Sequence, residues 1–260
     1  MPETITDPRD PRVADFHDLH AGDRRPGTER GTGPVVVEGV TAVERLLASG
    51  LAVRCVYGIP GRVAALDVPA GVPVYEADKW VLSGTIGFRL TRGVLASCER
   101  PAPPSLADLL AGARRIAVLE GLNDHENIGS IGRSAWALGI DALLLDPTCA
   151  DPYYRRSVRV SMGHLLTTPL RVLTDWPGDL ARVRAAGFTT VALTPGARTD
   201  LRDVDPAQHP RTALLLGAEG PGLSEAAMAA VDVRARIPMR PGVDSLGVAA
   251  AAAVAFAQLR

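Results

Sequence analysis

The amino-acid sequence predicts an α/β protein, in which a small α/β unit precedes a larger domain whose parallel sheet carries helices on both faces. Three observations lead to this fold class. The chain has 260 residues, more than one ordinary domain requires. Short apolar runs alternate with helical patterns along its second half, as they do in parallel sheets. Between the two parts lies a proline-rich stretch, ERPAPPSLADLLAG, that predicts a linker.

The first hundred residues predict an arm followed by the small unit. Residues 1–32 are rich in Asp, Arg, Pro and Gly, so we expect this arm to be either disordered or laid over the fold. Over residues 33–100, apolar residues at helical spacing predict a helix that Gly50 ends, namely Val40, Val43, Leu46 and Leu47. Short apolar runs predict strands at 35–38, 53–58, 72–77 and 93–98.

The larger domain is expected to span residues 114–260, after a linker over 101–113. Because ligands of open α/β sheets gather at the carboxyl ends of the strands, the loops that follow these strands are where we expect the chemistry. Helical stretches are predicted to begin near Ile128, Tyr153, Trp176 and Leu223. Five apolar runs predict strands at 115–121, 141–146, 189–194, 212–219 and 233–239.

The first of these loops, LEGLNDHENIGSIGRSAWALG, joins a strand to a helix. The simpler interpretation is a helix start, with Asn127 as its N-cap. The functional interpretation places Asn127 and Arg133, six residues apart, at the same end of the sheet. Arg133 is poorly matched to the positive end of a helix dipole, which indicates an anionic or hydroxyl-bearing ligand.

The second loop, LLLGAEGPGLSEAAM, places three glycines around Glu219. Glycines allow positive φ and let a backbone approach a ligand closely. The loop has neither the Lys-Ser/Thr pair of a phosphate-binding loop nor a dinucleotide fingerprint. Ser224 is expected to cap the next helix, and the Glu219 carboxylate must meet a cation or remain in water.

The third loop precedes an alanine-rich terminal helix in RIPMRPGVDSLGVAAAAAV. Asp244 or Ser245 is the expected helix cap. Five consecutive alanines at 249–253 favour a helix and leave only small side chains on each of its faces. Such a helix suits burial against backbone or against another subunit better than a place on the surface.

Charge and cysteine content exclude several classes of protein. The net charge of −1 gives no global attraction to nucleic acid, so an RNA partner would need a local patch. One candidate patch lies beside Tyr153 and Tyr154 and consists of Arg155, Arg156, Arg159 and Arg171. The arginine excess alternatively reflects a GC-rich genome. Three widely spaced cysteines argue against a disulfide framework or a zinc site, and we expect no metal. With no apolar run long enough to span a bilayer, we expect a cytoplasmic protein and no membrane partner.

Taken in order, the motifs N-x-G-x-x-x-R, G-A-E-G-x-G-L-S and I-P-M-x(5)-S-L-x-V-A resemble those of the SpoU/TrmH family of RNA ribose 2′-O-methyltransferases, in the SPOUT superfamily. The resemblance covers residue 114 to the end of the chain. It implies a C-terminal trefoil knot, S-adenosylmethionine as cofactor, a homodimer and an RNA substrate. The front unit is similar to the ribosomal-protein-like RNA-binding domain of rRNA-modifying members, which favours rRNA over tRNA.

The resemblance also implies roles for single residues. Arg133 and Asn127 match the first motif, in which the arginine acts on the ribose 2′-hydroxyl, and Arg133 also contacts RNA. Glu219 and Ser245 complete the expected catalytic set. The positions expected to bind the cofactor are Leu216, Gly217, Gly222, Ile237, Met239, Ser245 and Leu246.

One position departs from the family pattern. Where the third motif usually reads S-L-N, this chain has Ser245-Leu246-Gly247. We expect a working enzyme, because the other motif residues are present. A rival hypothesis is a non-catalytic RNA-binding protein that keeps the fold. A dehydrogenase or a Rossmann-type methyltransferase is disfavoured, because no glycine fingerprint follows the first strand of either part.

Overall fold

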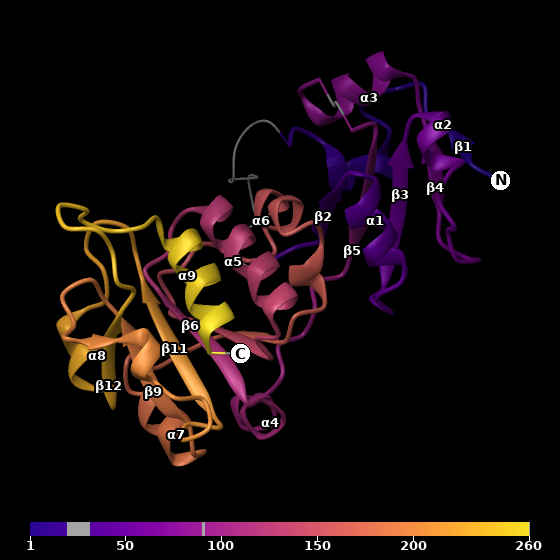
Figure 1. Ribbon diagram of the computed structural model, residues 1–260. Helices are drawn as coiled ribbons and strands as arrows, with labels where there is room; N and C mark the ends of the chain where they lie inside the picture. Colours follow the sequence, from indigo (N-terminus) through magenta and orange to yellow (C-terminus); the bar gives the residue numbers. More distant parts are fainter. Residues whose placement is uncertain (20–31, 90–91, 260) are drawn as a thin grey trace. The chain divides into compact units, whose positions relative to one another are not determined.

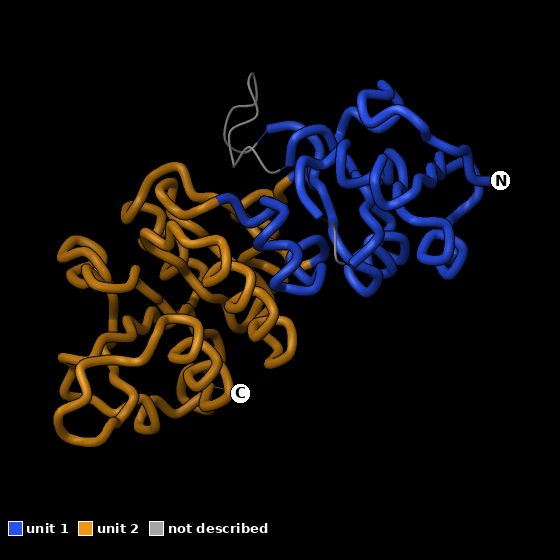
Figure 2. The backbone as a smooth tube through the Cα atoms, turned by 90° about the horizontal axis from the view of Figure 1, so that it is seen from above, with its two compact units in different colours: residues 1–102, 151–167 blue, residues 103–150, 168–260 orange. Residues whose placement is uncertain are grey.

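The computed structural model describes residues 1–19, 32–89 and 92–259, and the chain divides into two compact units (Figure 1, Figure 2). Unit 1 comprises residues 1–102 and 151–167, and unit 2 comprises residues 103–150 and 168–260. Each unit has its own sheet.

Unit 1 is built on a sheet of order β1-β4-β3-β5-β2. Strand β5 is antiparallel to its neighbours β2 and β3, and the other pairs are parallel. The strands and the helix predicted over 33–100 are confirmed. In chain order the unit contains β1 (Glu3–Thr4), η1 (Pro11–Phe16), β2 (Val35–Glu38), α1 (Val40–Leu47), β3 (Val53–Gly58), α2 (Pro60–Val63), β4 (Val74–Glu76), α3 (Lys79–Ile86), β5 (Val94–Cys98), α6 (Arg155–Val160) and η2 (His164–Leu166).

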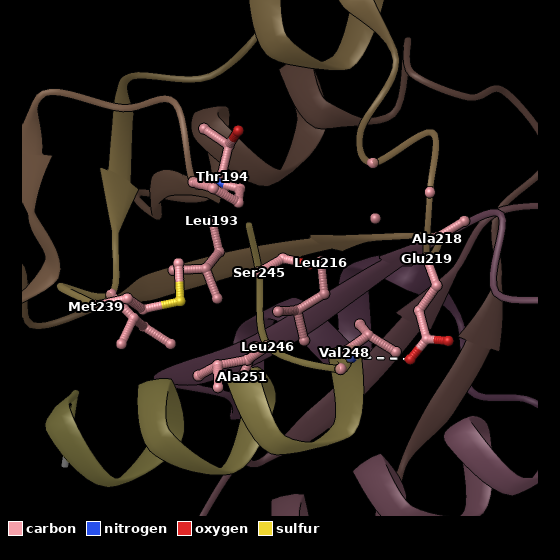
Figure 3. A pocket seen from close by; sticks show the side chains of 16 residues that line it. Leu193, Thr194, Leu216, Ala218, Glu219, Met239, Ser245, Leu246, Val248 and Ala251 are labelled. Atoms are coloured by element: carbon pink, nitrogen blue, oxygen red, sulfur yellow. Dashed lines mark hydrogen bonds between the residues drawn. The ribbon is translucent and has the colours of Figure 1, made fainter. Parts of the chain in front are cut away.

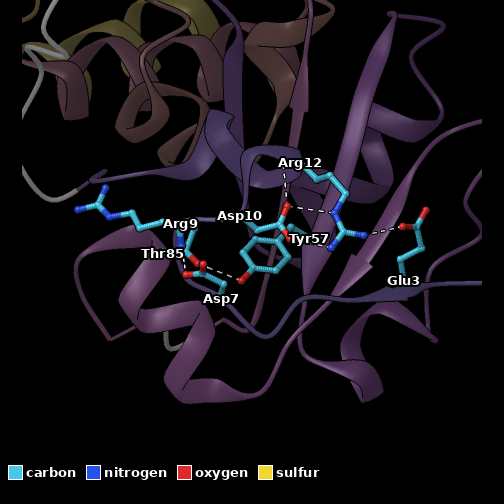
Figure 4. Close-up of polar contacts among 7 residues, drawn as sticks. All are labelled: Glu3, Asp7, Arg9, Asp10, Arg12, Tyr57 and Thr85. Atoms are coloured by element: carbon cyan, nitrogen blue, oxygen red, sulfur yellow. Dashed lines mark hydrogen bonds and ion pairs between the residues drawn. The ribbon is translucent and has the colours of Figure 1, made fainter.

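The described part of the N-terminal arm lies on the small unit. Strand β1 adds to the sheet beside β4, and Phe16 is fully buried with its ring stacked on Tyr57, 5.6 Å between centroids. Figure 4 shows Arg12 between Glu3 and Asp10, with its guanidinium nitrogens 2.7 and 2.6 Å from the two carboxylates. Of the two expected arrangements, residues 1–19 adopt the ordered one. The rest of the arm, 20–31, lies outside the described residues.

Unit 2 is built on a sheet of order β10-β12-β9-β11-β6-β7-β8 in which every pair is parallel. This confirms the predicted α/β class, and the five predicted strands are present. In chain order the unit contains α4 (Leu106–Gly112), β6 (Arg115–Glu120), α5 (His125–Leu138), β7 (Ala142–Leu145), β8 (Leu170–Val172), α7 (Leu180–Ala185), β9 (Thr189–Leu193), β10 (Thr199–Asp200), η3 (Leu201–Asp203), β11 (Thr212–Gly217), α8 (Glu225–Ala229), β12 (Val233–Arg236) and α9 (Val248–Gln258).

Both faces of this sheet are covered by helices. Ile116 and Val118 of β6 belong to a buried cluster with leucines of α4 and α7. The alternate residues Ala117 and Leu119 are equally buried and point to the opposite face, because successive side chains of a strand alternate. Helices α5 and α9 pack against each other on that face (Figure 1). The small side chains of the alanine-rich α9 therefore pack against α5 and the sheet.

The structure divides the chain differently from the expected domains in two places. Ser105 caps α4, and the side chains of Leu106, Leu109 and Leu110 are buried in unit 2. Residues 106–112 of the expected linker are therefore a core helix. Residues 151–167, expected within the larger domain, pack with unit 1 because α6 contacts β2.

Across residues 1–19, 32–89 and 92–259, no helix combines the length and the apolar composition that crossing a membrane requires.

Candidate functional site

A cavity of about 400 Å³ opens in unit 2 beyond the carboxyl ends of β9, β11 and β12 (Figure 3). Three loops and the start of α9 form its walls. All the residues that the resemblance assigned to cofactor binding line it, namely Leu216, Gly217, Gly222, Ile237, Met239, Ser245 and Leu246. The structure thus gathers into one cavity residues that are up to 30 positions apart in the sequence, as for Leu216 and Leu246.

Close backbone contact explains Gly217. A Cβ atom at this position would lie 2.2 Å from the carbonyl carbon of Gly222 and 2.3 Å from the amide nitrogen of Leu223. The loop folds back onto the strand end, where the Gly222 amide donates to the Ala218 carbonyl oxygen at 2.9 Å. Gly222 itself has φ +73°, a conformation that favours glycine. Gly217 therefore lets the loop close tightly beside the cavity.

Glu219 joins this loop to the terminal helix. Its Oε1 accepts a hydrogen bond from the backbone N–H of Val248 at 3.2 Å (Figure 3). Gly247 is the N-cap residue of α9 and supplies no side-chain acceptor. The expectation that Asp244 or Ser245 caps this helix is wrong, because the cap comes from Glu219, 29 residues earlier. The carboxylate meets the positive end of the helix dipole instead of a cation.

A buried carboxylate holds the other end of the same loop. Glu120, at the end of β6, accepts hydrogen bonds from the Ser224 amide at 2.9 Å, the Ser224 hydroxyl at 2.7 Å and the indole N–H of Trp176 at 2.5 Å. Ser224 also caps α8, as predicted, by accepting from the Ala227 amide. Sequence reasoning missed Glu120, although a charged residue directly after the apolar run of residues 116–119 was a usable signal.

Sequence reasoning also missed one wall of the cavity. Leu193 at the end of β9 lines it, as do Thr194 and Pro195, which follow this strand, and Val248 and Ala251 of α9. Strand β9 was predicted correctly, and it lies next to β11 in the sheet. The adjacency of these two strands, which follows from the tertiary fold, brings the loop after β9 to the site.

The structure does not bring Asn127 and Arg133 into this cavity. Helix α5 begins earlier than expected, with Asp124 as its N-cap accepting from the Glu126 amide at 2.7 Å. Asn127 therefore lies within the first turn, and its expected capping role is wrong. Six helical residues separate two side chains by about 9 Å along the axis and about 120° around it. Asn127 and Arg133 thus leave α5 on different sides.

The expected arginine patch is only partly neutralised, and its members do not all lie in one unit. Arg171 belongs to β8 of unit 2, where its guanidinium donates to the Pro104 carbonyl oxygen at 2.7 Å. The Arg155 guanidinium is hydrogen-bonded to the buried Glu38 carboxylate and lies over the Phe88 ring, 5.0 Å from its centroid. Arg159 is 4.0 Å from the same carboxylate. Arg156 is exposed and forms no ion pair with a described residue. The negative charge that faces Arg155 and Arg159 is the Glu38 carboxylate on β2. Spacing along the sequence could not reveal this pairing.

The three cysteines are free and buried. Burial raises the pKa of the Cys55 thiol and raises that of Cys98 to about 12. Burial likewise raises the pKa of Cys149 well above its ordinary value. All three are therefore neutral thiols near pH 7, with little nucleophilic character. In the part of the chain that the structure describes, no His, Cys, Asp or Glu side chains gather in a group that could hold a metal ion.

Comparison with known proteins gives consistent results. The model of the SpoU rRNA methylase family matches residues 114–257. A Mycobacterium tuberculosis protein named an uncharacterized tRNA/rRNA methyltransferase is 50% identical over 98% of this chain and 90% of its own length. The 23S rRNA (guanosine(2553)-2′-O)-methyltransferase of Bacillus subtilis is 26% identical over 98% of both chains.

A solved structure extends the comparison to both units. The SpoU methyltransferase AviRb from Streptomyces viridochromogenes, crystallised with the cofactor AdoMet, superimposes with a TM-score of 0.78 at 27% identity. The match covers 96% of this chain and 97% of AviRb. Family model, sequence relatives and fold agree, and this chain belongs to the SpoU rRNA methylase family.

Proposed function

We propose that this protein transfers a methyl group from S-adenosylmethionine to a ribose 2′-hydroxyl of rRNA. The observation that carries the proposal is the cavity of unit 2, where residues from the second and third motifs come together at the carboxyl ends of parallel strands. The cofactor comes from the family, and rRNA from the names of relatives such as the Bacillus subtilis enzyme.

The residues of the cavity fit S-adenosylmethionine. Leu216, Ile237 and Leu246 supply apolar surface suited to an adenine ring, and the glycine-rich loop offers backbone groups to a ribose. Glu219 also lines the cavity, and its bond to the Val248 amide holds the loop against the start of α9. When bound, the cofactor supplies an electrophilic methyl group on a positively charged sulfur.

The protein's part in this chemistry is positioning and charge stabilisation. Holding a hydroxyl in line with a methyl group contributes roughly 7–11 kcal/mol through orientation alone. Arg133 is exposed on α5, and no ion pair joins it to a described residue, so its guanidinium is free to meet RNA. A guanidinium group keeps its positive charge in proteins and is a poor general base. Arg133 therefore stabilises the developing alkoxide and the adjacent phosphate, while the proton leaves to another acceptor or to water.

Substitution of Arg133 tests this role. Arg133→Ala is expected to abolish methyl transfer and leave cofactor affinity unchanged, because Arg133 does not line the cavity. Single-turnover methylation and calorimetric titration with S-adenosylmethionine measure the two effects separately. Arg202→Ala removes an exposed arginine of the same unit that is already paired with Asp200 at 2.5 Å, and it serves as the control. Undiminished turnover in Arg133→Ala would exclude the assigned role.

We also propose that the protein is a homodimer and that its terminal segment is threaded into the family's trefoil knot. Apolar surface on the two adjacent helices supports the dimer, since Trp136 of α5 and Val254 of α9 are 49% and 38% exposed. Light scattering is expected to give the mass of a dimer for the wild type. For Val254→Glu, which places a charge on this apolar surface, the dimer is expected to dissociate at higher protein concentrations than the wild type does. A monomeric wild type would contradict this part of the proposal.

Two measurements separate the proposed function from its rivals. A protein without affinity for S-adenosylmethionine would be a non-catalytic RNA-binding member of the fold. Mapping of 2′-O-methyl positions in total RNA, with and without the protein, then distinguishes rRNA from tRNA as substrate. A new methyl mark in 23S rRNA is the expected result.

A further inference from the structure

A second cavity, of about 250 Å³, lies entirely within unit 1 and is lined by three arginines. Arg62 follows β3, Arg92 precedes β5, and Arg159 belongs to α6. The remaining lining residues are 39–42, at the start of α1, and Met162. Segments that are distant in sequence thus bring three guanidinium groups to one cavity.

The positive charge of this cavity is largely uncompensated. Arg62 and Arg92 are exposed, and neither forms an ion pair or a hydrogen bond with any described residue. Arg159 has only a 4.0 Å contact with Glu38, whose carboxylate is already hydrogen-bonded to Arg155. One carboxylate is therefore shared between two arginines, and two further arginines have none.

The backbone is shaped to hold these side chains in place. Gly39 has φ +97°, and a Cβ there would lie 3.0 Å from Cδ of Arg92. A Cβ on Gly93 would lie 3.2 Å from Cγ of Arg62. The two glycines leave room for the arginine stems, so the stems pack on the backbone beside the cavity.

The start of α1 adds partial positive charge. Its N-cap residue is Gly39, which has no side chain to accept from the first amides of the helix. The backbone N–H groups of Val40, Thr41 and Ala42 therefore remain available at the wall of the cavity. Guanidinium forks and helix amides are both donors that match the oxygens of a phosphate.

We propose that this cavity binds a backbone phosphate of the RNA substrate, an assignment that rests on the proposed function for the identity of the polyanion. The exposure of Arg62 and Arg92 leaves the cavity open, so that a phosphate within a chain can enter while its two ester links continue outward. Among the described residues, no aromatic or amide side chain lines it. The contact therefore positions RNA and carries no base selection.

The test measures binding of in-vitro-transcribed 23S rRNA by filter retention, without cofactor, over a series of KCl concentrations. Arg62→Ala and Arg92→Ala are each expected to weaken binding roughly tenfold and to reduce the slope of log K against log salt by about 1. Arg9→Ala is the matched control. It removes one exposed arginine from the same unit, but that arginine is already paired with Asp18 at 2.7 Å and lies outside the cavity.

Four further measurements complete the test: circular dichroism, RNA binding by lysine variants, thermal stability with inorganic phosphate, and methylation by the wild type. Circular dichroism checks folding, and Arg62→Lys and Arg92→Lys, which keep the charge, are expected to bind with intermediate affinity. Binding and slope equal to those of Arg9→Ala would overturn the proposal. Stabilisation of the wild type by inorganic phosphate, with RNA affinity unchanged in the variants, would instead identify a free-anion site and also overturn it. If the variants lose RNA affinity while the wild type methylates nothing, the proposed function fails and the phosphate site stands.

Discussion

Replacing Gly217 by alanine tests how tightly the second-motif loop closes on the strand end. The added Cβ would lie 2.2 Å from the Gly222 carbonyl carbon, where ordinary contacts begin near 3.4 Å. Either the end of β11 or the loop at Gly222 must therefore move by more than 1 Å. Strand β11 is hydrogen-bonded on both sides, to β6 and β9, so the loop must move instead.

The loss in free energy of unfolding follows from the contacts that the displaced loop gives up. Overpacking costs about 1–3 kcal/mol, and the hydrogen bond from the Gly222 amide to Ala218 contributes about 0.5–1.5 kcal/mol, for a total of roughly 2–4 kcal/mol. In a unit of this size that lowers the melting temperature by on the order of 10 °C. Because the displaced loop lines the cavity, affinity for S-adenosylmethionine should fall with it.

Gly247→Ala is the control, since both glycines line the same cavity. At Gly247 the backbone has φ −55°, and a Cβ would lie 3.4 Å from Glu219 Oε1, an ordinary contact. Its effect on the free energy of unfolding should stay within about 1 kcal/mol. Thermal unfolding and calorimetric titration compare the two variants. Equal melting temperatures and affinities would refute the packing argument.

Three further predictions concern caps and charges in unit 2. Glu219→Ala should lower the free energy of unfolding by about 1 kcal/mol through loss of the α9 cap, and Glu219→Gln by less, as urea unfolding can measure; equal losses would contradict the role of charge. Gly247→Asn should change the methylation rate little, because Glu219 already caps α9; a large gain in single-turnover rate would show that the natural site is impaired. Burial raises the pKa of Asp232, but hydrogen bonds from Thr190 and the nearby Arg184 outweigh it and hold that pKa below its ordinary value. Asp232→Asn should therefore be less stable than the wild type near pH 7, and the difference should vanish as the pH falls below the ordinary carboxyl range; a difference that persists in acid would exclude this linkage.

Local sequence patterns predicted most of the fold because they reflect interactions between near neighbours in the chain. The apolar runs at 115–121 and 212–219 gave β6 and β11, and the Ser224 cap was identified from the residue type alone. The same locality explains the errors. Asn127 is a good capping residue by type, but Asp124 occupies the cap, and only the backbone path distinguishes the two.

The resemblance to the family assigned the cofactor-binding residues, and the tertiary fold places all of them along one cavity. Their roles stay predictions, as do those of Asn127 and Arg133, which lie outside that cavity. The similarity of the front unit to a ribosomal-protein-like RNA-binding domain stays a prediction. So do the knot, the dimer and the cytoplasmic location.

The sequence by itself determined the α/β class, the order of strands and helices, and the loops that carry the motifs, because periodicity and turn chemistry are local. Only the tertiary structure decided that the Glu219 carboxylate caps a helix 29 residues away and that Arg155 is neutralised by Glu38, 117 residues distant. Residues 151–167 join unit 1 for the same reason. Such pairings depend on which segments pack together, and packing is a property of the whole chain.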